Sequence, residues 1–121
     1  MTVKECYTLL SADFDGVMSR LLAEKRVAKF AARFPDDPSF NQLLSSLEGG
    51  DIATAFRAAH TLKGTSANLG FTSLYEKASA VTEELRNGNP GPDFGKKLEE
   101  CKKEYAGTLE ILNRYISEKE D

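Results

Sequence analysis

The sequence predicts an all-α protein folded as an antiparallel, up-down bundle. Apolar residues recur throughout the chain at the i, i+3, i+4, i+7 spacing of amphipathic helices, and no segment shows the Val, Ile and Thr alternation of a strand. Short connections rich in glycine and proline separate the helical segments, and short connections join antiparallel neighbours. The 121 residues, 40% of them hydrophobic and 29% charged, suffice for one domain with one core.

The first helix is predicted at residues 2–10, where Thr2 and Glu5 have the spacing of a capping box. We expect this helix to be an addition to the core bundle. Residues 1–12 are therefore predicted to form an accessory helical segment and residues 13–121 the bundle, within one domain overall.

A second helical stretch begins at Asp13, but its apolar face changes direction. The apolar residues of the segment 14–21 lie on nearly the opposite side of a helical wheel from those of the segment 27–34. This change of phase predicts a break between residues 22 and 25. The later apolar face consists of Val27, Phe30, Ala31 and Phe34.

Proline and aspartate separate the next two helices. Pro35 ends one helix, and Asp37 is expected to cap the following helix with Pro38 at its first position. Gly49 and Gly50 then close that helix, and both are expected to supply left-handed backbone. The buried stripe of this helix is predicted to consist of Phe40, Leu43, Leu44 and Leu47.

Three further signals place the remaining helices. Asp51 is expected to cap a long helix at residues 51–69, which Gly70 stops. Another helix follows and ends at the glycine- and proline-rich turn of residues 87–92. Its apolar positions are Leu74, Ala78, Val81 and Leu85, and those of the last helix are Phe94, Leu98, Cys101, Tyr105, Thr108, Leu112 and Tyr115.

Composition argues against several classes of function. The net charge of −3 and the absence of a basic stripe do not favour nucleic-acid binding. No apolar run approaches the roughly 20 residues of a membrane span, and the N-terminus has no signal-peptide pattern, so we expect a cytoplasmic protein. Cys6 and Cys101 lack metal-binding spacing and are expected to be reduced thiols in the core.

The helix at residues 51–69 has two contrasting faces when it is drawn at 100° per residue. The apolar face is expected to pack into the bundle, and His60, the single histidine of the chain, lies well away from its centre. We therefore expect the imidazole to reach solvent. The apolar face consists of Ile52, Ala55, Ala59, Leu62 and Ser66, and the neighbours of His60 on the wheel are Ala53, Phe56, Gly64 and Ala67.

Gly64 is unexpected inside a helix, because glycine costs about 1 kcal/mol there relative to alanine. One turn beyond His60, the missing side chain would let the surface of another protein approach the imidazole. Lys63 and Arg57, three residues to either side of His60, could offer positive charge to a phosphoryl group.

An exposed imidazole is suited to reversible phosphoryl transfer, since it is partly neutral and nucleophilic near pH 7. Nε2 is the less hindered nitrogen of His60, so we expect it to attack and to form a phosphoramidate that can pass the group on to a carboxylate. The residues alone leave a second interpretation open, in which His60 is an ordinary surface histidine.

Residues 60–70, with the sequence HTLKGTSANLG, resemble the signature of the histidine-containing phosphotransfer (HPt) domain of multistep two-component phosphorelays. The family pattern has the acceptor histidine, a leucine two residues later, Lys-Gly after it, and a second glycine ten residues past the histidine. Each of these is present, and residues 49–51 match the turn that precedes the helix. The resemblance covers roughly residues 13–116 and is strongest at 49–88. Its other matching positions are Ala58, Ala59, Leu74, Ala78, Glu84, Leu85, Arg86 and Gly88.

The resemblance implies an antiparallel four-helix bundle with accessory N-terminal helices, in which His60 is phosphorylated, Lys63 lies near the phosphoryl group and Gly64 gives access to a partner. The implied partner is the receiver domain of a response regulator or hybrid histidine kinase. That domain would supply the aspartyl phosphate and the magnesium ion, so this chain would need no metal or cofactor of its own. We expect it to act as a monomer. The predicted docking surface consists of Ala53, Phe56, Arg57, Gly64, Ala67 and Asn68.

Three alternative functions compete with phosphoryl transfer. An ATP-dependent histidine kinase is disfavoured, because the chain has neither a G-x-x-x-x-G-K-[ST] loop nor the length for a nucleotide-binding domain. An adaptor bundle that docks partners without chemistry stays open. A hydrolase is disfavoured because no nucleophile, base and orienting acid stand in register, and Ser66 and Asp51 are better explained as a core hydroxyl and a helix cap.

Overall fold

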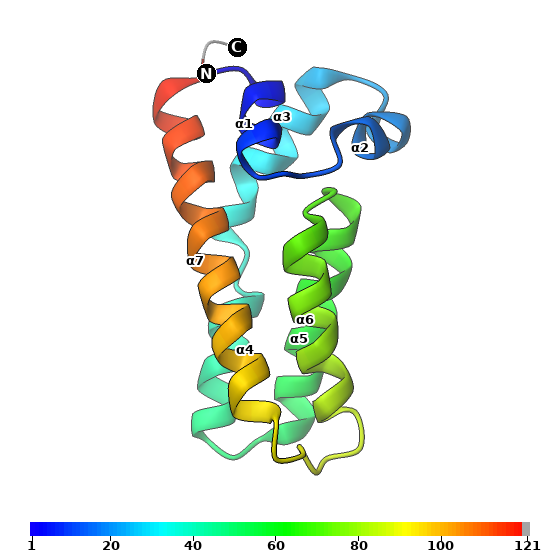
Figure 1. Ribbon diagram of the computed structural model, residues 1–121, viewed down its shortest axis with the longest axis vertical. Coiled ribbons are helices and arrows are strands. Elements are labelled where there is room, and N and C mark those ends of the chain that lie inside the picture. Colours follow the sequence, from blue (N-terminus) through cyan, green and yellow to red (C-terminus); the bar gives the residue numbers. More distant parts are fainter. Residues whose placement is uncertain (120–121) are drawn as a thin grey trace.

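The computed structural model describes residues 1–119 and confirms an all-α fold (Figure 1). The last two residues of the predicted bundle segment 13–121 lie outside the described part. No strand occurs within residues 1–119. In chain order the elements are α1 (Val3–Leu9), α2 (Phe14–Leu21), α3 (Glu24–Arg33), the 3-10 helix η1 (Phe34–Asp36), α4 (Ser39–Glu48), α5 (Ile52–Asn68), α6 (Thr72–Leu85) and α7 (Phe94–Glu118).

The long helices form an antiparallel up-down bundle. In Figure 1, α3, η1 and α4 descend in succession, α5 rises, α6 descends and α7 rises again. α5 packs between α4 and α6, and α6 packs against α7, while α3 and η1 contact the upper part of α7. The first member of the bundle is thus a broken helix whose upper and lower parts contact different neighbours.

α1 and α2 lie across the upper end of the bundle, near the described ends of the chain (Figure 1). α1 contacts α7, α2 and α3, and α2 contacts α3. These two accessory helices therefore close one end of the bundle, whereas the connection between α6 and α7 crosses the other end.

Several predicted helix starts are confirmed by their side-chain hydrogen bonds. The Thr2 hydroxyl accepts from the Glu5 N–H at 3.1 Å while the Glu5 carboxylate accepts from the Thr2 N–H at 3.2 Å. Asp13 accepts from the Gly16 N–H at 3.0 Å and Asp51 from the Thr54 N–H at 3.1 Å. Each cap satisfies a backbone donor that the first turn of a helix leaves free.

The predicted break after α2 is also confirmed. Leu22 has φ 67° and ψ 0°, a left-handed conformation that is uncommon for leucine, and its side chain is 74% exposed. The chain turns there, and α3 begins at Glu24 with its apolar residues in a new direction.

Three local expectations were wrong. α4 begins at Ser39, so Pro38 precedes the helix, although Asp37 does accept the Ser39 N–H at 2.8 Å. Of the two glycines after α4, Gly50 is left-handed with φ 74°, whereas Gly49 has φ −81° because it still follows the helical path. Phe30, expected on the buried face of α3, is 42% exposed because it lies at the outer edge of that face.

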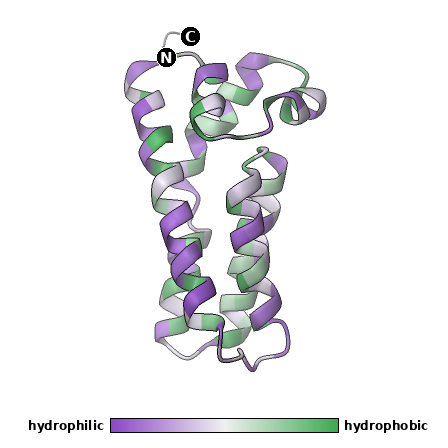
Figure 2. Ribbon diagram, in the orientation of Figure 1, coloured by the Kyte–Doolittle hydropathy of each residue, from purple (hydrophilic) through white to green (hydrophobic). Residues whose placement is uncertain are grey.

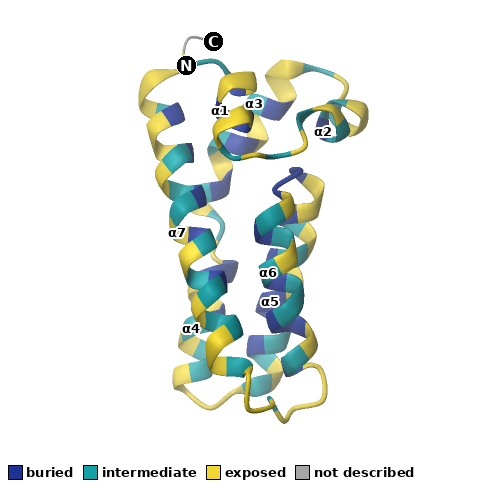
Figure 3. Ribbon diagram, viewed as in Figure 1, coloured by how far each residue is buried: buried dark blue, intermediate teal, exposed yellow. Residues whose placement is uncertain are grey.

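The core follows the predicted faces of the helices (Figures 2 and 3). In α7 the buried positions are Cys101, Tyr105, Thr108, Leu112 and Tyr115, while Phe94 and Leu98 at its start are half-buried. In α4, Phe40 and Leu43 are buried, and Leu44 and Leu47 are half-buried. The lysines and glutamates of α7 are exposed or half-buried.

An aromatic group, here called the junction cluster, joins the accessory helices to the bundle. Its members are Tyr7, Phe14, Phe34, Phe71 and Tyr105, whose rings meet in successive pairs with centroids 5.3 to 6.1 Å apart. The Tyr7 hydroxyl donates a buried hydrogen bond of 2.6 Å to the Leu69 carbonyl at the end of α5. Such aromatic packing contributes a large buried area, and the hydroxyl is satisfied as a buried tyrosine requires.

Both cysteines are free and buried, as expected. Burial raises the pKa of the Cys6 and Cys101 thiols to about 11, so both are protonated at neutral pH. None of the helices in residues 1–119 combines the length and apolar character that a membrane span requires.

Candidate functional site

α5 is a helix of small residues held between two neighbours. Asp51 fixes its start, and its buried stripe allows α4 and α6 to pack closely against it. The stripe consists of Ala55, Ala58, Ala59, Leu62 and Ser66, while Ile52 is half-buried. The Ser66 hydroxyl is the core-side group expected, and it has no hydrogen-bond partner in the described part of the chain.

His60 lies in the middle of α5 and is exposed, as the helical wheel predicts. Its imidazole meets the Phe56 ring edge to face, with centroids 6.0 Å apart and planes at 72°. The half-buried phenyl ring of Phe56 thus supports one side of the imidazole, and the rest of the ring is open to approach.

Gly64 is exposed one turn further along α5. A Cβ placed there would meet no atom of residues 1–119 within 4 Å, so packing inside this domain does not require glycine. Ala53 and Ala67, which flank His60 on the same face, are also exposed. The surface around the imidazole is therefore low and unobstructed.

The two predicted cations take different positions. Lys63 is half-buried, and its charge acts on Glu83 of α6, so its side chain belongs to the α6 side of His60. Arg57 turns toward the start of α5, where its Nη2 donates to the Thr54 hydroxyl at 3.0 Å. Thr54 in turn donates to the Asp51 carboxylate at 2.6 Å, so Arg57 belongs to the capping network of the helix.

That network has a simple electrostatic signature. The two hydrogen bonds from Thr54 lower the pKa of Asp51 below its usual range, and the nearby charge of Arg57 lowers it further.

Asn68, the last predicted docking residue, is exposed, and its backbone carbonyl accepts two hydrogen bonds from Arg20 of α2 at 2.9 and 3.3 Å. Within residues 1–119, the hydrogen bonds of Arg57 and of the Asn68 carbonyl thus go to Thr54 and Arg20 and not to the imidazole.

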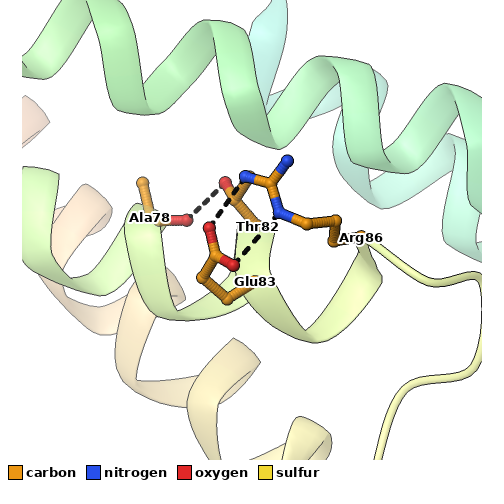
Figure 4. A network of polar contacts seen from close by, with 4 residues as sticks. All are labelled: Ala78, Thr82, Glu83 and Arg86. Carbon is orange, nitrogen blue, oxygen red and sulfur yellow. Dashed lines mark hydrogen bonds and ion pairs between the residues drawn. The ribbon is translucent and has the colours of Figure 1, made fainter.

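Glu83 of α6 and Arg86, which directly follows that helix, were missed as site residues by the sequence analysis. Their side chains form an ion pair with two hydrogen bonds, 2.8 Å from Nη2 to Oε1 and 3.1 Å from Nε to Oε2 (Figure 4). Thr82 beside them donates to the Ala78 carbonyl at 2.7 Å, as a helical threonine often does. The Arg86 guanidinium also lies over the Phe56 ring, 5.2 Å from its centroid.

A signal for this pair was present in the sequence. α5 and α6 form an antiparallel hairpin around the short turn at Gly70, so residues at similar distances on either side of that turn lie side by side. The i, i+3 spacing of Glu83 and Arg86 then places both charges on one face of α6. His60 lies ten residues before Gly70, so this geometry pairs it with Ala80, and Glu83 follows one helical turn later on α6.

The charges around Glu83 change the pKa of its carboxyl group. The hydrogen bond from Arg86 lowers the pKa of Glu83, and the charges of Arg86, Lys63 and His60 lower it further. Within residues 1–119, no group of three or more His, Cys, Asp or Glu side chains is placed to hold a metal ion.

Comparison with a family model identifies the family of this chain. The family model of the Hpt domain matches residues 26–111, which include all of α4, α5 and α6 and most of α3 and α7. Searches of curated proteins and of solved structures each gave no match. The match covers well over half of the chain and includes His60 on its exposed helix, so this protein belongs to the Hpt domain family.

Proposed function

We propose that His60 accepts a phosphoryl group from the phospho-aspartate of one receiver domain and donates it to the aspartate of another. Proteins with this domain carry phosphoryl groups in two-component signalling and interact with receiver domains. The observation that carries the assignment to His60 is its geometry: the single imidazole of the chain is exposed on α5, beside a glycine whose Cβ direction is empty.

The chemical step needs one nucleophilic nitrogen. With the proton on Nδ1, the Nε2 lone pair attacks phosphorus, and the bond from phosphorus to the aspartyl oxygen breaks with its electrons returning to the carboxylate. The ring, now bonded to phosphorus and still carrying its Nδ1 proton, holds one positive charge beside the phosphoryl dianion. No proton has to leave, so no helper base is needed, and the reverse step regenerates the imidazole.

The surrounding residues have supporting roles in this proposal. The Lys63 ammonium would attract the phosphoryl dianion, and Gly64 would leave room for the receiver domain. Ala53, Phe56 and Ala67 would form the floor of the docking surface. The magnesium ion of the transfer would be bound by the receiver domain, and this chain would act as a monomer in the cytoplasm without ATP-dependent activity.

The test is transfer of label from a purified receiver domain that has been charged with radiolabelled acetyl phosphate. We expect label on the wild-type chain that is stable in alkali and labile in acid, as a phosphohistidine is, and none on His60→Gln. Thermal unfolding should show that the substituted chain is folded. Label that persists on His60→Gln would place the acceptor elsewhere and contradict the proposal.

Two further outcomes separate the alternatives. Labelling by ATP alone would identify a kinase. Binding of the receiver domain that is equal in the wild type and His60→Gln, without acid-labile label on either, would identify an adaptor bundle.

A further inference from the structure

The side of His60 that faces α6 has a layered arrangement of three side chains. The Phe56 ring contacts the imidazole at a centroid distance of 6.0 Å and carries the Arg86 guanidinium at 5.2 Å from its centroid. A cation at this distance over a phenyl ring is attracted to its face. One aromatic side chain therefore holds a guanidinium near the proposed phosphorylation site.

Glu83 occupies the hydrogen-bonding edge of that guanidinium. Both carboxylate oxygens are engaged, at 2.8 and 3.1 Å, in the bidentate geometry that arginine also uses for phosphate. The two side chains are about half exposed, 56% for Glu83 and 46% for Arg86, so neither is locked by burial. The charges of Lys63 and His60 act on the same carboxylate. The Glu83 carboxylate is thus the anion shared by three basic side chains, Arg86, Lys63 and His60.

We propose that Glu83 and Arg86 control the stability of phosphorylated His60 in opposite directions: Arg86 binds the phosphoryl group, and Glu83 competes with that group for Arg86. This inference rests on the proposed function of His60 and adds a regulatory pair to it. In the unphosphorylated protein Glu83 neutralises and orients Arg86. When a phosphoryl dianion is attached to Nε2, a second anion with the same fork geometry becomes available to the guanidinium.

The competition has a consequence for the relay. If Arg86 held the phosphoryl group without a competitor, phosphohistidine would be more stable and onward transfer less favourable. The Glu83 carboxylate reduces that stabilisation, both by retaining Arg86 and by repelling the dianion. The pair would therefore keep the phosphorylated state close in free energy to its donor and acceptor, as a reversible carrier requires.

The experiment uses phosphoramidate, a small phosphodonor that needs no partner protein. Nε2 attacks the phosphorus of the zwitterionic donor, whose nitrogen already carries three hydrogens. The phosphorus–nitrogen bond breaks with its electrons going to nitrogen, and neutral ammonia leaves. The measured quantity is the ratio of phosphorylated to unmodified His60 at a fixed ratio of phosphoramidate to ammonium, determined by 31P NMR at low ionic strength. We expect Glu83→Gln to raise this ratio and Arg86→Ala to lower it, each by about two- to fivefold.

The opposite signs distinguish this mechanism from a structural role, since loss of an ion pair that only stabilises the fold would change both variants alike. The matched control is Glu99→Gln on α7, which breaks another exposed i, i+3 pair, with Lys102 at 3.2 Å, and should leave the ratio unchanged. In wild type, the Nε–H NMR signal of Arg86 should shift when His60 is phosphorylated. Both effects should be weaker near 1 M salt, where the Debye length falls to about 3 Å.

Each outcome has a defined meaning. Ratios that change in the same direction in the two variants, or an Arg86 signal that does not respond to phosphorylation, would overturn the competition between Glu83 and the phosphoryl group. A wild-type chain that phosphoramidate leaves unlabelled at His60 would instead count against the proposed function itself.

Discussion

The His60 face lies on the α5–α6 hairpin and the junction cluster packs around the turn of that hairpin, but the two regions are built in contrasting ways. Around His60, Ala53, Ala67 and Gly64 are small and exposed, Phe56 and Lys63 are half-buried, and Gly64 lies against open space. At the other end of the hairpin, Tyr7, Phe34 and Phe71 are almost fully buried and in contact with one another or with neighbouring rings. The difference teaches that the surface proposed for chemistry contributes little to stability, while the buried rings supply the stability that keeps this surface in place.

The largest effect is expected from the junction cluster. Phe34 is 2% exposed and contacts the Phe71 and Tyr105 rings, so Phe34→Ala should lower the free energy of unfolding by about 3–5 kcal/mol. Urea denaturation followed by circular dichroism measures this loss. Phe30→Ala, four residues earlier on α3 and 42% exposed, is the matched control and should cost much less. Equal losses in the two variants would break the contrast between buried and exposed rings.

At Gly64 we expect a smaller effect on the free energy of unfolding but a clear effect on the rate of phosphoryl transfer. Gly64→Leu should stabilise α5 slightly by helix propensity, yet slow transfer from a receiver domain at least about tenfold by blocking its approach. Labelling by phosphoramidate should stay close to wild type, because a small donor does not need the docking surface.

The control for this substitution is Gly107→Ala on α7, where a Cβ also meets no atom within 4 Å in the described chain. That variant should gain a similar stability from helix propensity and keep the wild-type transfer rate. If Gly64→Leu transfers as fast as wild type, the open surface beside His60 is not a docking surface.

The smallest effect is expected at Lys63. Lys63→Ala should slow phosphorylation of His60 by about two- to fivefold at low salt, because a half-buried cation that still faces water attracts the phosphodonor only weakly. The rate difference should shrink as the salt concentration rises. Quenched time courses with a phosphorylated receiver domain at low and high ionic strength give the two phosphorylation rates. Lys96→Ala on α7 is the distant control. A rate equal to wild type at low salt would contradict the proposal that the Lys63 ammonium attracts the phosphodonor.

How far the sequence predicted the structure depended on whether the determining interaction was local. The caps at Thr2 and Asp51 involve residues three apart, so the local sequence was sufficient to predict them. The exposure of His60 followed from helical periodicity. In contrast, the 42% exposure of Phe30 depends on where α3 meets its neighbours, which periodicity does not specify.

The charged surroundings of His60 were harder to predict for the same reason. The helical wheel placed Arg57 close enough to His60 to offer charge to a phosphoryl group. In the structure its guanidinium instead donates to the Thr54 hydroxyl. Glu83 and Arg86 reach the site through the packing of α5 against α6, so only the hairpin geometry brings them into view. The family pattern indicated His60 without indicating how the neighbouring helix distributes charge around it.

The turn between α5 and α6 has one further consequence. Its carbonyl groups accept hydrogen bonds from three residues that precede the family match: Tyr7 donates to Leu69, the Asp13 N–H to Gly70 at 2.8 Å, and Arg20 to Asn68. A chain shortened to begin at residue 26 would lose all three donors and uncover the apolar residues beneath them. We therefore expect the smallest part of this chain that folds on its own to be longer than the segment matched by the family model, because the N-terminal helices cover the end of the hairpin that holds His60.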